Sequence, residues 1–342
     1  MKPSSSISSR CMLFSQQTSF PVSVHEQNAK TTRSDSHKWV MFIHGLSKDG
    51  ENHGSALKKA LTQSTVAQEW NFFSSKACTS FILPYLTLNN TMRGLDVVSG
   101  AVLEEIVDFF GDKPIPTHIS IIGASYGGVV ARQLAFKLNQ MWVDVHFESL
   151  VLVASPTLGK LGVATPTKWS KEYFFNMLSL NATKEMHLVD TTNWLSVLGT
   201  EPTYLDTYSK FRKRLIYAPV WNDNIVAYES ASLLGVVPLV PINSINENPL
   251  VSCPGRVLTV QDSLEAVAFA DHESSGGGEV AQKVSGIQRG MMSCGWTLYD
   301  VNTNHRLLAT LRASERGDVL TGDRRGLAAK EIAEHIVSQI IV

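Results

Sequence analysis

The sequence predicts an α/β protein, a doubly wound and mostly parallel sheet with a helical cap insertion. Continuous apolar runs, which are typical of strands buried on both faces of a parallel sheet, recur along the chain. Stretches with the spacing of an amphipathic helix lie between these runs, as in successive strand–helix–strand units. The chain has 342 residues, of which 44% are apolar, so it can bury one large core.

Strands and helices are expected to alternate from residue 38 to residue 341. We expect strands or short strand-like segments at 38–43, 72–86, 118–122, 149–154, 215–220, 256–260 and 296–301. We expect helices at 52–64, 97–110, 129–138, 280–292 and 327–341. An aromatic-rich helical insertion at 160–208 fits a cap over a site, and an ordinary packed helix pair is compatible with the same residues. The polar, glycine-rich stretch 261–279 is predicted to be a mobile loop.

The first 35 residues differ in composition from the rest of the chain. Residues 1–24 are rich in serine, contain Lys2 and Arg10, and have no acidic residue. Two basic residues are few for a mitochondrial or other organelle transit peptide, so we favour a disordered tail over that alternative. The folded α/β domain is therefore expected over residues 36–342.

Charge and cysteine content argue against several classes of protein. Thirty basic and 31 acidic residues give a net charge of −1, which provides no reason to expect a nucleic-acid partner. The longest apolar run, residues 231–245, contains two prolines and is too short to span a bilayer. We therefore expect a cytoplasmic protein, soluble or peripheral. The cysteines are scattered without a C-x-x-C pair, which favours reduced thiols over a disulfide frame or a zinc site: Cys11, Cys78, Cys253 and Cys294.

The segment from Ile119 to Gly128 carries the strongest chemical signal. An apolar strand runs into a Gly-x-Ser-x-Gly turn centred on Ser125, and a helix-compatible run follows. In a nucleophile elbow the serine occupies a sharp, strained strand-to-helix turn that holds its hydroxyl out. Gly123 and Gly127 are required because a Cβ at either position would collide with the neighbouring strand and helix. Ser125 is therefore the predicted nucleophile.

The end of the first predicted strand fits an oxyanion loop. Residues His44-Gly45-Leu46 follow it directly. In α/β-hydrolases such a loop supplies half of the oxyanion hole, because the glycine lets the next amide, here that of Leu46, point at the substrate. The amide of Tyr126 would be the second donor. We interpret His44 as a brace of this loop rather than as a catalytic group.

Serine is a poor nucleophile near neutral pH unless an imidazole removes its proton and a carboxylate orients that imidazole. In α/β-hydrolases the chain order is serine, acid, histidine, which excludes acids that precede Ser125. Asp223 follows the strand at 215–220 in an Asn-Asp-Asn turn and is the predicted acid. Asp190 and Asp206 lie in the insertion, where capping or salt bridges are expected.

Five histidines follow the serine in the chain. His305 comes four residues after the last clear strand and is the predicted base, with His272 on the glycine-rich loop as the alternative. We place His146 before a strand, His187 in the insertion and His335 on the exposed side of the terminal helix.

Further motifs extend the pattern: Asn90-Thr91-x-x-Gly94-x-Asp96, Ala154-Ser155-Pro156-x-x-Gly159, Leu188-Val189-Asp190, Phe211-x-x-Arg214, Asn222-Asp223-x-x-Val226 and Trp296-x-x-x-Asp300-Val301. With the elbow and the oxyanion loop, residues 38–342 resemble the DUF676 family of serine esterases or lipases. The resemblance implies an α/β-hydrolase that acts on acyl esters of lipids with Ser125, Asp223 and His305 in triad positions. Ala227 and Thr157 depart from the family's usual proline and histidine, which leaves the substrate preference open.

The predicted activity is hydrolysis of carboxylic esters of lipids through an acyl-enzyme, as in a lipase or lysophospholipase. No cofactor and no metal is required, and the partners would be a lipid or acyl-ester substrate and, transiently, a membrane or lipid droplet. The alternatives are a thioesterase, a short-chain carboxylesterase, and a non-catalytic hydrolase-fold protein that binds a lipid or a partner.

Overall fold

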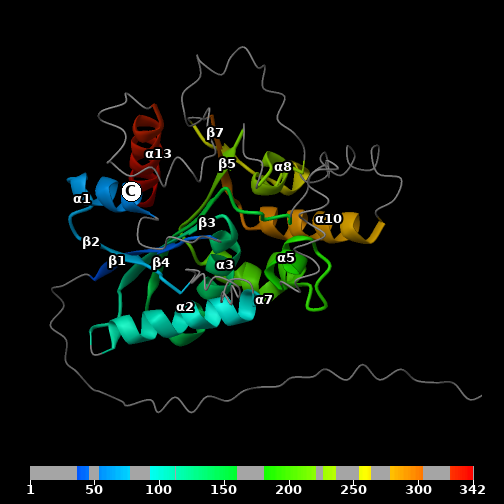
Figure 1. Cartoon of the computed structure of the whole chain (residues 1–342), viewed down its shortest axis with the longest axis horizontal. Coiled ribbons are helices and arrows are strands. Elements are labelled where there is room, and N and C mark those ends of the chain that lie inside the picture. The colour runs from blue at the N-terminus through cyan, green and yellow to red at the C-terminus, as the bar shows by residue number, and fades with distance from the viewer. Residues whose placement is uncertain are drawn as a thin grey trace, which may run out of the picture. The chain divides into compact units, whose positions relative to one another are not determined.

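The computed structural model describes residues 37–45, 54–77, 93–111, 113–159, 181–220, 226–235, 254–262, 278–302 and 324–341, with side chains in the last of these ranges from residue 329 onward. Their strands are β1 (Lys38–Ile43), β2 (Trp70–Ser74), β3 (His118–Ala124), β4 (His146–Val153), β5 (Lys213–Pro219), β6 (Arg256–Val257) and β7 (Thr297–Val301). Their helices are α1 (Ser55–Gln63), α2 (Leu95–Phe110), α3 (Tyr126–Met141), α5 (Asn181–Met186), α6 (Trp194–Thr200), α7 (Pro202–Ser209), α8 (Tyr228–Ala231), α10 (Gly278–Ser293) and α13 (Arg324–Ile341) (Figure 1).

The described strands form a seven-stranded sheet in the order β2-β1-β3-β4-β5-β7-β6. Every neighbouring pair is parallel except β6 and β7. In a parallel sheet, successive strands must be joined by crossovers, and the helices between them cover both faces. The predicted doubly wound, mostly parallel architecture is confirmed.

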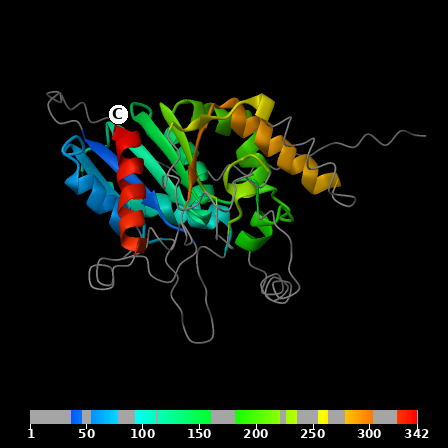
Figure 2. The same cartoon turned by 90° about the horizontal axis from the view of Figure 1, so that it is seen from above.

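Helices on both faces of the sheet explain the continuous apolar runs in the sequence. Val40 and Phe42 of β1 pack with α1 and α13 on one face, whereas Met41 and Ile43 pack with α2 and α3 on the other. Successive side chains of a strand point to opposite faces, so a strand covered on both sides needs apolar residues at every position. Figure 2 shows α1 and α13 together on one side of the sheet.

Most predicted elements are confirmed to within a few residues, and three boundaries were wrong. Strand β2 begins at Trp70 and ends at Ser74, and the described residues after it, 75–77, are not a strand. Strand β4 begins at His146, which therefore lies in the strand and not before it. Strand β6 has only two residues. It ends because Asp262 accepts hydrogen bonds from the amide and the hydroxyl of Thr259, at 2.7 Å each, and draws the chain into a turn.

The insertion between β4 and β5 contains three described helices, α5, α6 and α7. The first part of the predicted insertion, 160–180, lies outside the described residues, as does 263–277 of the predicted loop. Cys294 is buried as a free thiol at the end of α10, as expected, and the other three cysteines lie outside the described residues. No described helix is both long enough and apolar enough to cross a membrane.

Candidate active site

Ser125 lies at the carboxyl end of β3, between the strands β1 and β4. Its backbone has φ 56° and ψ −132°, a conformation that L residues rarely adopt and that costs on the order of 1–3 kcal/mol. Two hydrogen bonds hold this turn. The Ser125 amide donates to the Val153 carbonyl oxygen, and the Gly128 amide donates to the Ser125 carbonyl oxygen, both at 2.9 Å. The side chain has a relative exposure of 9%.

The glycines of the elbow lie where backbones meet. A Cβ on Gly123 would be 2.5 Å from both the Gly127 carbonyl oxygen and the Gly128 Cα. A Cβ on Gly127 would be 2.6 Å from the His44 carbonyl oxygen and would overlap that of Ile43. Because the obstacles are backbone atoms, no side-chain rotation could relieve the clash. Helix α3 therefore packs directly against β1 and β3, and this contact fixes the turn at Ser125.

Gly45 lies against the predicted nucleophile. A Cβ on Gly45 would be 2.6 Å from the Ser125 Cβ and 3.1 Å from the Ser125 Oγ. This approach follows from the register, because β1 pairs with β3 so that Ile43 is opposite Gly123. The loop after β1 thus reaches the serine at the point where an oxyanion loop would be needed. Leu46 itself lies outside the described residues.

The second predicted donor of the oxyanion hole, the amide of Tyr126, lies at the start of helix α3. Tyr126 is the first residue of this 16-residue helix. Amides at a helix N-terminus point outward with a positive partial charge, which favours a developing anion. The imidazole of His44, on the opposite side of the turn, is fully buried, and its Nδ1 donates to the Gly45 carbonyl oxygen at 2.8 Å. This contact is the one expected of a residue that braces the loop.

The predicted acid and base, Asp223 and His305, lie outside the described residues, and so does the alternative base, His272. Strands β5 and β7, which lead to the predicted pair, are described. They end at Pro219 and Val301, each four residues before the predicted group (223 − 219 and 305 − 301). Both strands are parallel to β3, so they end at the same edge of the sheet as Ser125.

The remaining candidates fall into structural roles. Asp190 accepts hydrogen bonds from the Trp194 amide, at 2.9 Å, and from the Thr192 hydroxyl, at 2.7 Å, so it caps helix α6 as expected. His335 was expected on the exposed side of α13, but it is half-buried, and its Nδ1 lies 3.0 Å from the Tyr217 Oη. Burial lowers the pKa of His335. His146 lies at the opposite, amino-terminal edge of the sheet, where its ring centroid is 4.9 Å from that of His118 and the two rings are tilted by 30°.

One carboxylate at this edge was missed by the sequence analysis. Glu185 of α5 accepts a hydrogen bond from the Tyr126 hydroxyl at 2.6 Å and bonds from the Leu95 amide at 2.9 and 3.1 Å. Burial raises the pKa of Glu185, against the effect of these hydrogen bonds. A half-buried acid, Asp300, accepts a bond from the Tyr228 hydroxyl at 2.7 Å, and desolvation raises its pKa too. Asp300 belongs to the Trp296-x-x-x-Asp300-Val301 motif, whereas no sequence pattern singles out Glu185.

Within the described ranges, no group of three or more histidine, cysteine, aspartate or glutamate side chains could hold a metal ion. A strained serine at the end of a central parallel strand, opposed by a glycine of the loop after the neighbouring strand, defines an α/β-hydrolase.

Residues 33–233 match the family model described as "Putative serine esterase (DUF676)", and the protein belongs to this family. The match covers more than half of the chain and includes the elbow and the oxyanion loop. The resemblance found in the sequence is thereby confirmed. No curated protein matches the chain.

Several solved structures are similar to this chain. Carboxyl esterase 2 from the mycorrhizal fungus Tuber melanosporum is 11% identical, with 90% of this chain and 80% of that chain covered and a TM-score of 0.40. Est1E from Butyrivibrio proteoclasticus is 12% identical, with 91% of each chain covered and a TM-score of 0.41. An α/β-hydrolase superfamily protein from Enterococcus faecalis is 11% identical, with 91% and 92% covered and a TM-score of 0.42.

Proposed function

We propose that the protein is a serine hydrolase that cleaves carboxylic esters of lipids through an acyl-enzyme on Ser125. The observation that carries this proposal is the strained backbone of Ser125, with Gly45 packed against its side chain. A strained conformation persists only where surrounding contacts enforce it, and such sites cluster where chemistry occurs. A protein that only binds a lipid has no need to hold a hydroxyl in this way.

The proposed reaction has two steps. His305, oriented by Asp223, takes the proton from the Ser125 hydroxyl as the serine oxygen attacks the ester carbonyl carbon. The resulting oxyanion is bound by the amides of Leu46 and Tyr126, each worth about 3 kcal/mol in the transition state. His305 then gives its proton to the leaving alcohol. In the second step it activates a water molecule, which releases the acid and restores the serine.

A lipid substrate is supported by the insertion between β4 and β5. One of its described helices, α5, packs at the carboxyl edge through Glu185, beside Tyr126 of the elbow. Residues 160–180 of the insertion are rich in aromatic residues in the sequence, a composition that suits the binding of a fatty acyl chain. We further propose that the protein is cytoplasmic and contacts a membrane or lipid droplet transiently. Flotation of the protein with phosphatidylcholine vesicles in a density gradient would test this contact. Protein that stays entirely in the bottom fraction of the gradient would reject it.

A fluorophosphonate probe tests the nucleophile. We expect the wild-type protein to be labelled and Ser125→Ala to be unlabelled, because the probe phosphonylates only an activated serine, with loss of fluoride. Ser120→Ala is the matched control, since Ser120 is buried on the same strand, five residues earlier. Labelling that survives in Ser125→Ala would exclude Ser125. A folded wild-type protein that is never labelled would favour the non-catalytic alternative.

A series of p-nitrophenyl esters with increasing acyl length tests the substrate class. For a lipid ester hydrolase, kcat/KM should rise from acetate to long acyl chains, because each buried methylene adds about 0.8 kcal/mol of binding. If only the short-chain esters are hydrolysed, the protein is a short-chain carboxylesterase and not a lipid ester hydrolase. Faster turnover of the matching acyl thioesters would favour a thioesterase.

Substitutions of the two undescribed partners test the triad. We expect His305→Ala to lower kcat by about 10⁴- to 10⁶-fold, as for the loss of a general base in a serine hydrolase. His272→Ala should leave kcat within about twofold of the wild type, on the same reasoning. The reverse result would make His272 the base.

A further inference from the structure

Glu185 joins three helices at the carboxyl edge of the sheet. It lies on α5, in the insertion, and its carboxylate contacts the first residue of α3, Tyr126, and the first residue of α2, Leu95. Its relative exposure is only 4%. The approach is close because residue 94 is a glycine, where a Cβ would be 2.9 Å from the Glu185 Oε1. A second bond, from the Asn181 side-chain amide to the Arg93 carbonyl oxygen at 2.9 Å, ties α5 to the same end of α2.

The contact bears on the proposed reaction through Tyr126. The hydroxyl of Tyr126 donates to Glu185, while its backbone amide is the predicted oxyanion donor next to Ser125. The tyrosine ring is buried, with a relative exposure of 1%, so its hydroxyl needs a hydrogen-bond acceptor. Fixing the hydroxyl fixes the ring and, with it, the first residue of α3. An amide must lie within a few tenths of an ångström of its working position to stabilise a transition state.

The geometry points to Glu185 as a positioning residue of the esterase site, which aligns the Tyr126 amide and couples the insertion to the nucleophile elbow. This inference rests on the proposed function. A carboxylate is not indispensable for this role, because a glutamine oxygen at the position of Oε2 could accept both the Tyr126 hydroxyl and the Leu95 amide. A leucine of similar size could do neither.

Two substitutions of Glu185 separate positioning from packing. We expect Glu185→Leu to lower kcat on a p-nitrophenyl ester by about 10- to 100-fold, with KM changed less than about twofold, because only transition-state alignment is lost. Glu185→Gln should restore kcat to within about threefold of the wild type, because it keeps both hydrogen bonds. The rate of fluorophosphonate labelling should follow kcat in each variant.

Tyr126→Phe completes the test as a mild truncation that keeps the ring. It should lower kcat about as much as Glu185→Leu, and the double variant should be no slower than either single one, because both remove the same hydrogen bond. Asp190→Asn is the control within the insertion. It weakens the cap of α6 and lowers Tm, and it should leave kcat within about twofold of the wild type.

The outcomes that overturn the inference are distinct from those that overturn the function. If Tyr126→Phe and Glu185→Leu lower Tm but leave kcat unchanged, Glu185 is only structural. The same holds if the two effects add in the double variant. Should Glu185→Leu fail to fold, Tyr126→Phe and Glu185→Gln decide the question alone. In all these cases, labelling of the wild type and its loss in Ser125→Ala would leave the proposed function intact. A wild type with neither labelling nor turnover would reject both.

Discussion

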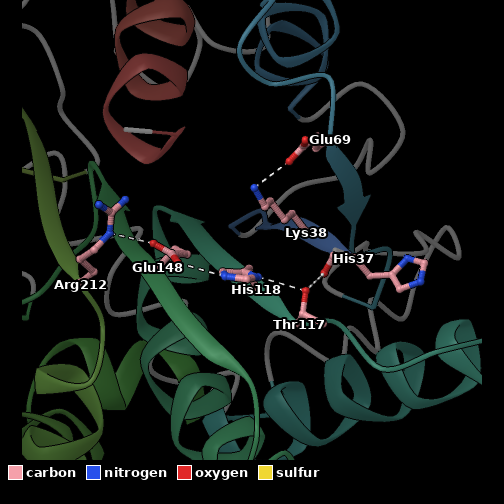
Figure 3. Close-up of polar contacts among 7 residues, drawn as sticks. All are labelled: His37, Lys38, Glu69, Thr117, His118, Glu148 and Arg212. Carbon is pink, nitrogen blue, oxygen red and sulfur yellow. Dashed lines mark hydrogen bonds and ion pairs between the residues drawn. The ribbon is translucent and has the colours of Figure 1, made fainter. Parts of the chain in front are cut away.

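The two edges of the sheet differ in their backbones, although a hydroxyl, an imidazole and a carboxylate meet at one edge and are predicted to meet at the other. At the carboxyl edge lies Ser125. At the amino edge, Thr117, His118 and Glu148 form a chain of a hydroxyl, an imidazole and a carboxylate, as Figure 3 shows. The Thr117 Oγ1 is 3.0 Å from the His118 Nδ1, and the His118 Nε2 is 3.8 Å from the Glu148 Oε1. By residue type alone, this group at the amino edge resembles a catalytic triad as closely as the predicted set of Ser125, Asp223 and His305 does.

Hydrogen-bond directions and backbone geometry distinguish the two edges. The Thr117 hydroxyl donates to the His37 carbonyl oxygen at 3.2 Å, so the His118 Nδ1 must donate to Thr117 and cannot accept its proton. Glu148 also binds Arg212, with 2.8 Å between Oε2 and Nε. Neither Thr117 nor His118 has a positive φ, whereas Ser125 and Ala154 at the carboxyl edge have φ of 56° and 44°. Backbone strain and close backbone contacts, rather than residue types, mark the candidate site.

The largest expected effect is that of adding a methyl group to the elbow. Gly127→Ala should destabilise the protein by about 3 kcal/mol or more, because the new Cβ would meet backbone atoms of β1 and the loop after it. Gly100→Ala is the matched control, since a Cβ there meets nothing within 4 Å, and it should stabilise α2 by up to about 1 kcal/mol. Urea unfolding of both variants makes the measurement. Equal stabilities would contradict the close packing of α3 on β1.

The next effect tests the strain at Ser125 itself. Ser125→Gly should be about 1 kcal/mol more stable than Ser125→Ala, because glycine adopts a φ of 56° without the cost that alanine keeps. Both variants should be inactive, so the comparison isolates the backbone from the chemistry. Thermal unfolding of the pair is sufficient. A Ser125→Gly variant that is no more stable than Ser125→Ala would show that the turn stores no strain.

At the amino edge a smaller effect is expected. Thr117→Val and His118→Gln should each change kcat/KM by less than about twofold and stability by less than about 1 kcal/mol, because the ion pairs there are partly exposed. Ester turnover and urea unfolding provide the two values. A large loss of turnover in either variant would mean that the resemblance to a triad is functional after all.

The smallest effect is a dependence of stability on pH. Burial is the main cause that lowers the pKa of His118. The charge of Glu148 raises this pKa, whereas those of His146 and Lys38 lower it further. The unfolded chain therefore binds more protons at this residue than the folded protein does. Stability should fall as the pH drops below about 6.5, the ordinary histidine value, toward the lower folded value.

His118→Gln should lose less stability than the wild type between pH 7 and pH 5.5, because it lacks this titrating group. The measurement is the urea midpoint of both proteins at the two pH values. Identical losses would show that the pKa of His118 does not differ between the folded and unfolded states.

Much of the fold could be predicted because its strands are buried on both faces. The continuous apolar runs of β3, β4 and β5 indicate such strands from sequence alone. The boundaries that were wrong lie where that signal is absent. Strand β2 is at the edge of the sheet and begins with partly exposed Trp70 and exposed Asn71. The two residues of β6 are defined only by pairing with β7, which is a tertiary contact.

The candidate site, like the fold, has one part that could be predicted from the sequence and another part that could not. The elbow could be predicted because its strain and its glycines are local properties of a five-residue turn. The Tyr126–Glu185 bond joins residues that are 59 positions apart. Likewise, Ser155 fills the space beside Gly128, 27 positions away (155 − 128). No pattern of spacing encodes such pairs, because packing of the insertion and of the strand ends brings them together.

The packing of α1 against α13 has a consequence for how the protein folds during synthesis. Leu57 and Leu61 of α1 share a core cluster with Ile332 and Ile336 of α13, although 261 positions (324 − 63) separate the two helices. A ribosome adds about 5–20 residues per second, so α1 waits roughly 13 to 52 s before α13 exists. During that time the apolar face of α1 is uncovered and is a natural target for a chaperone.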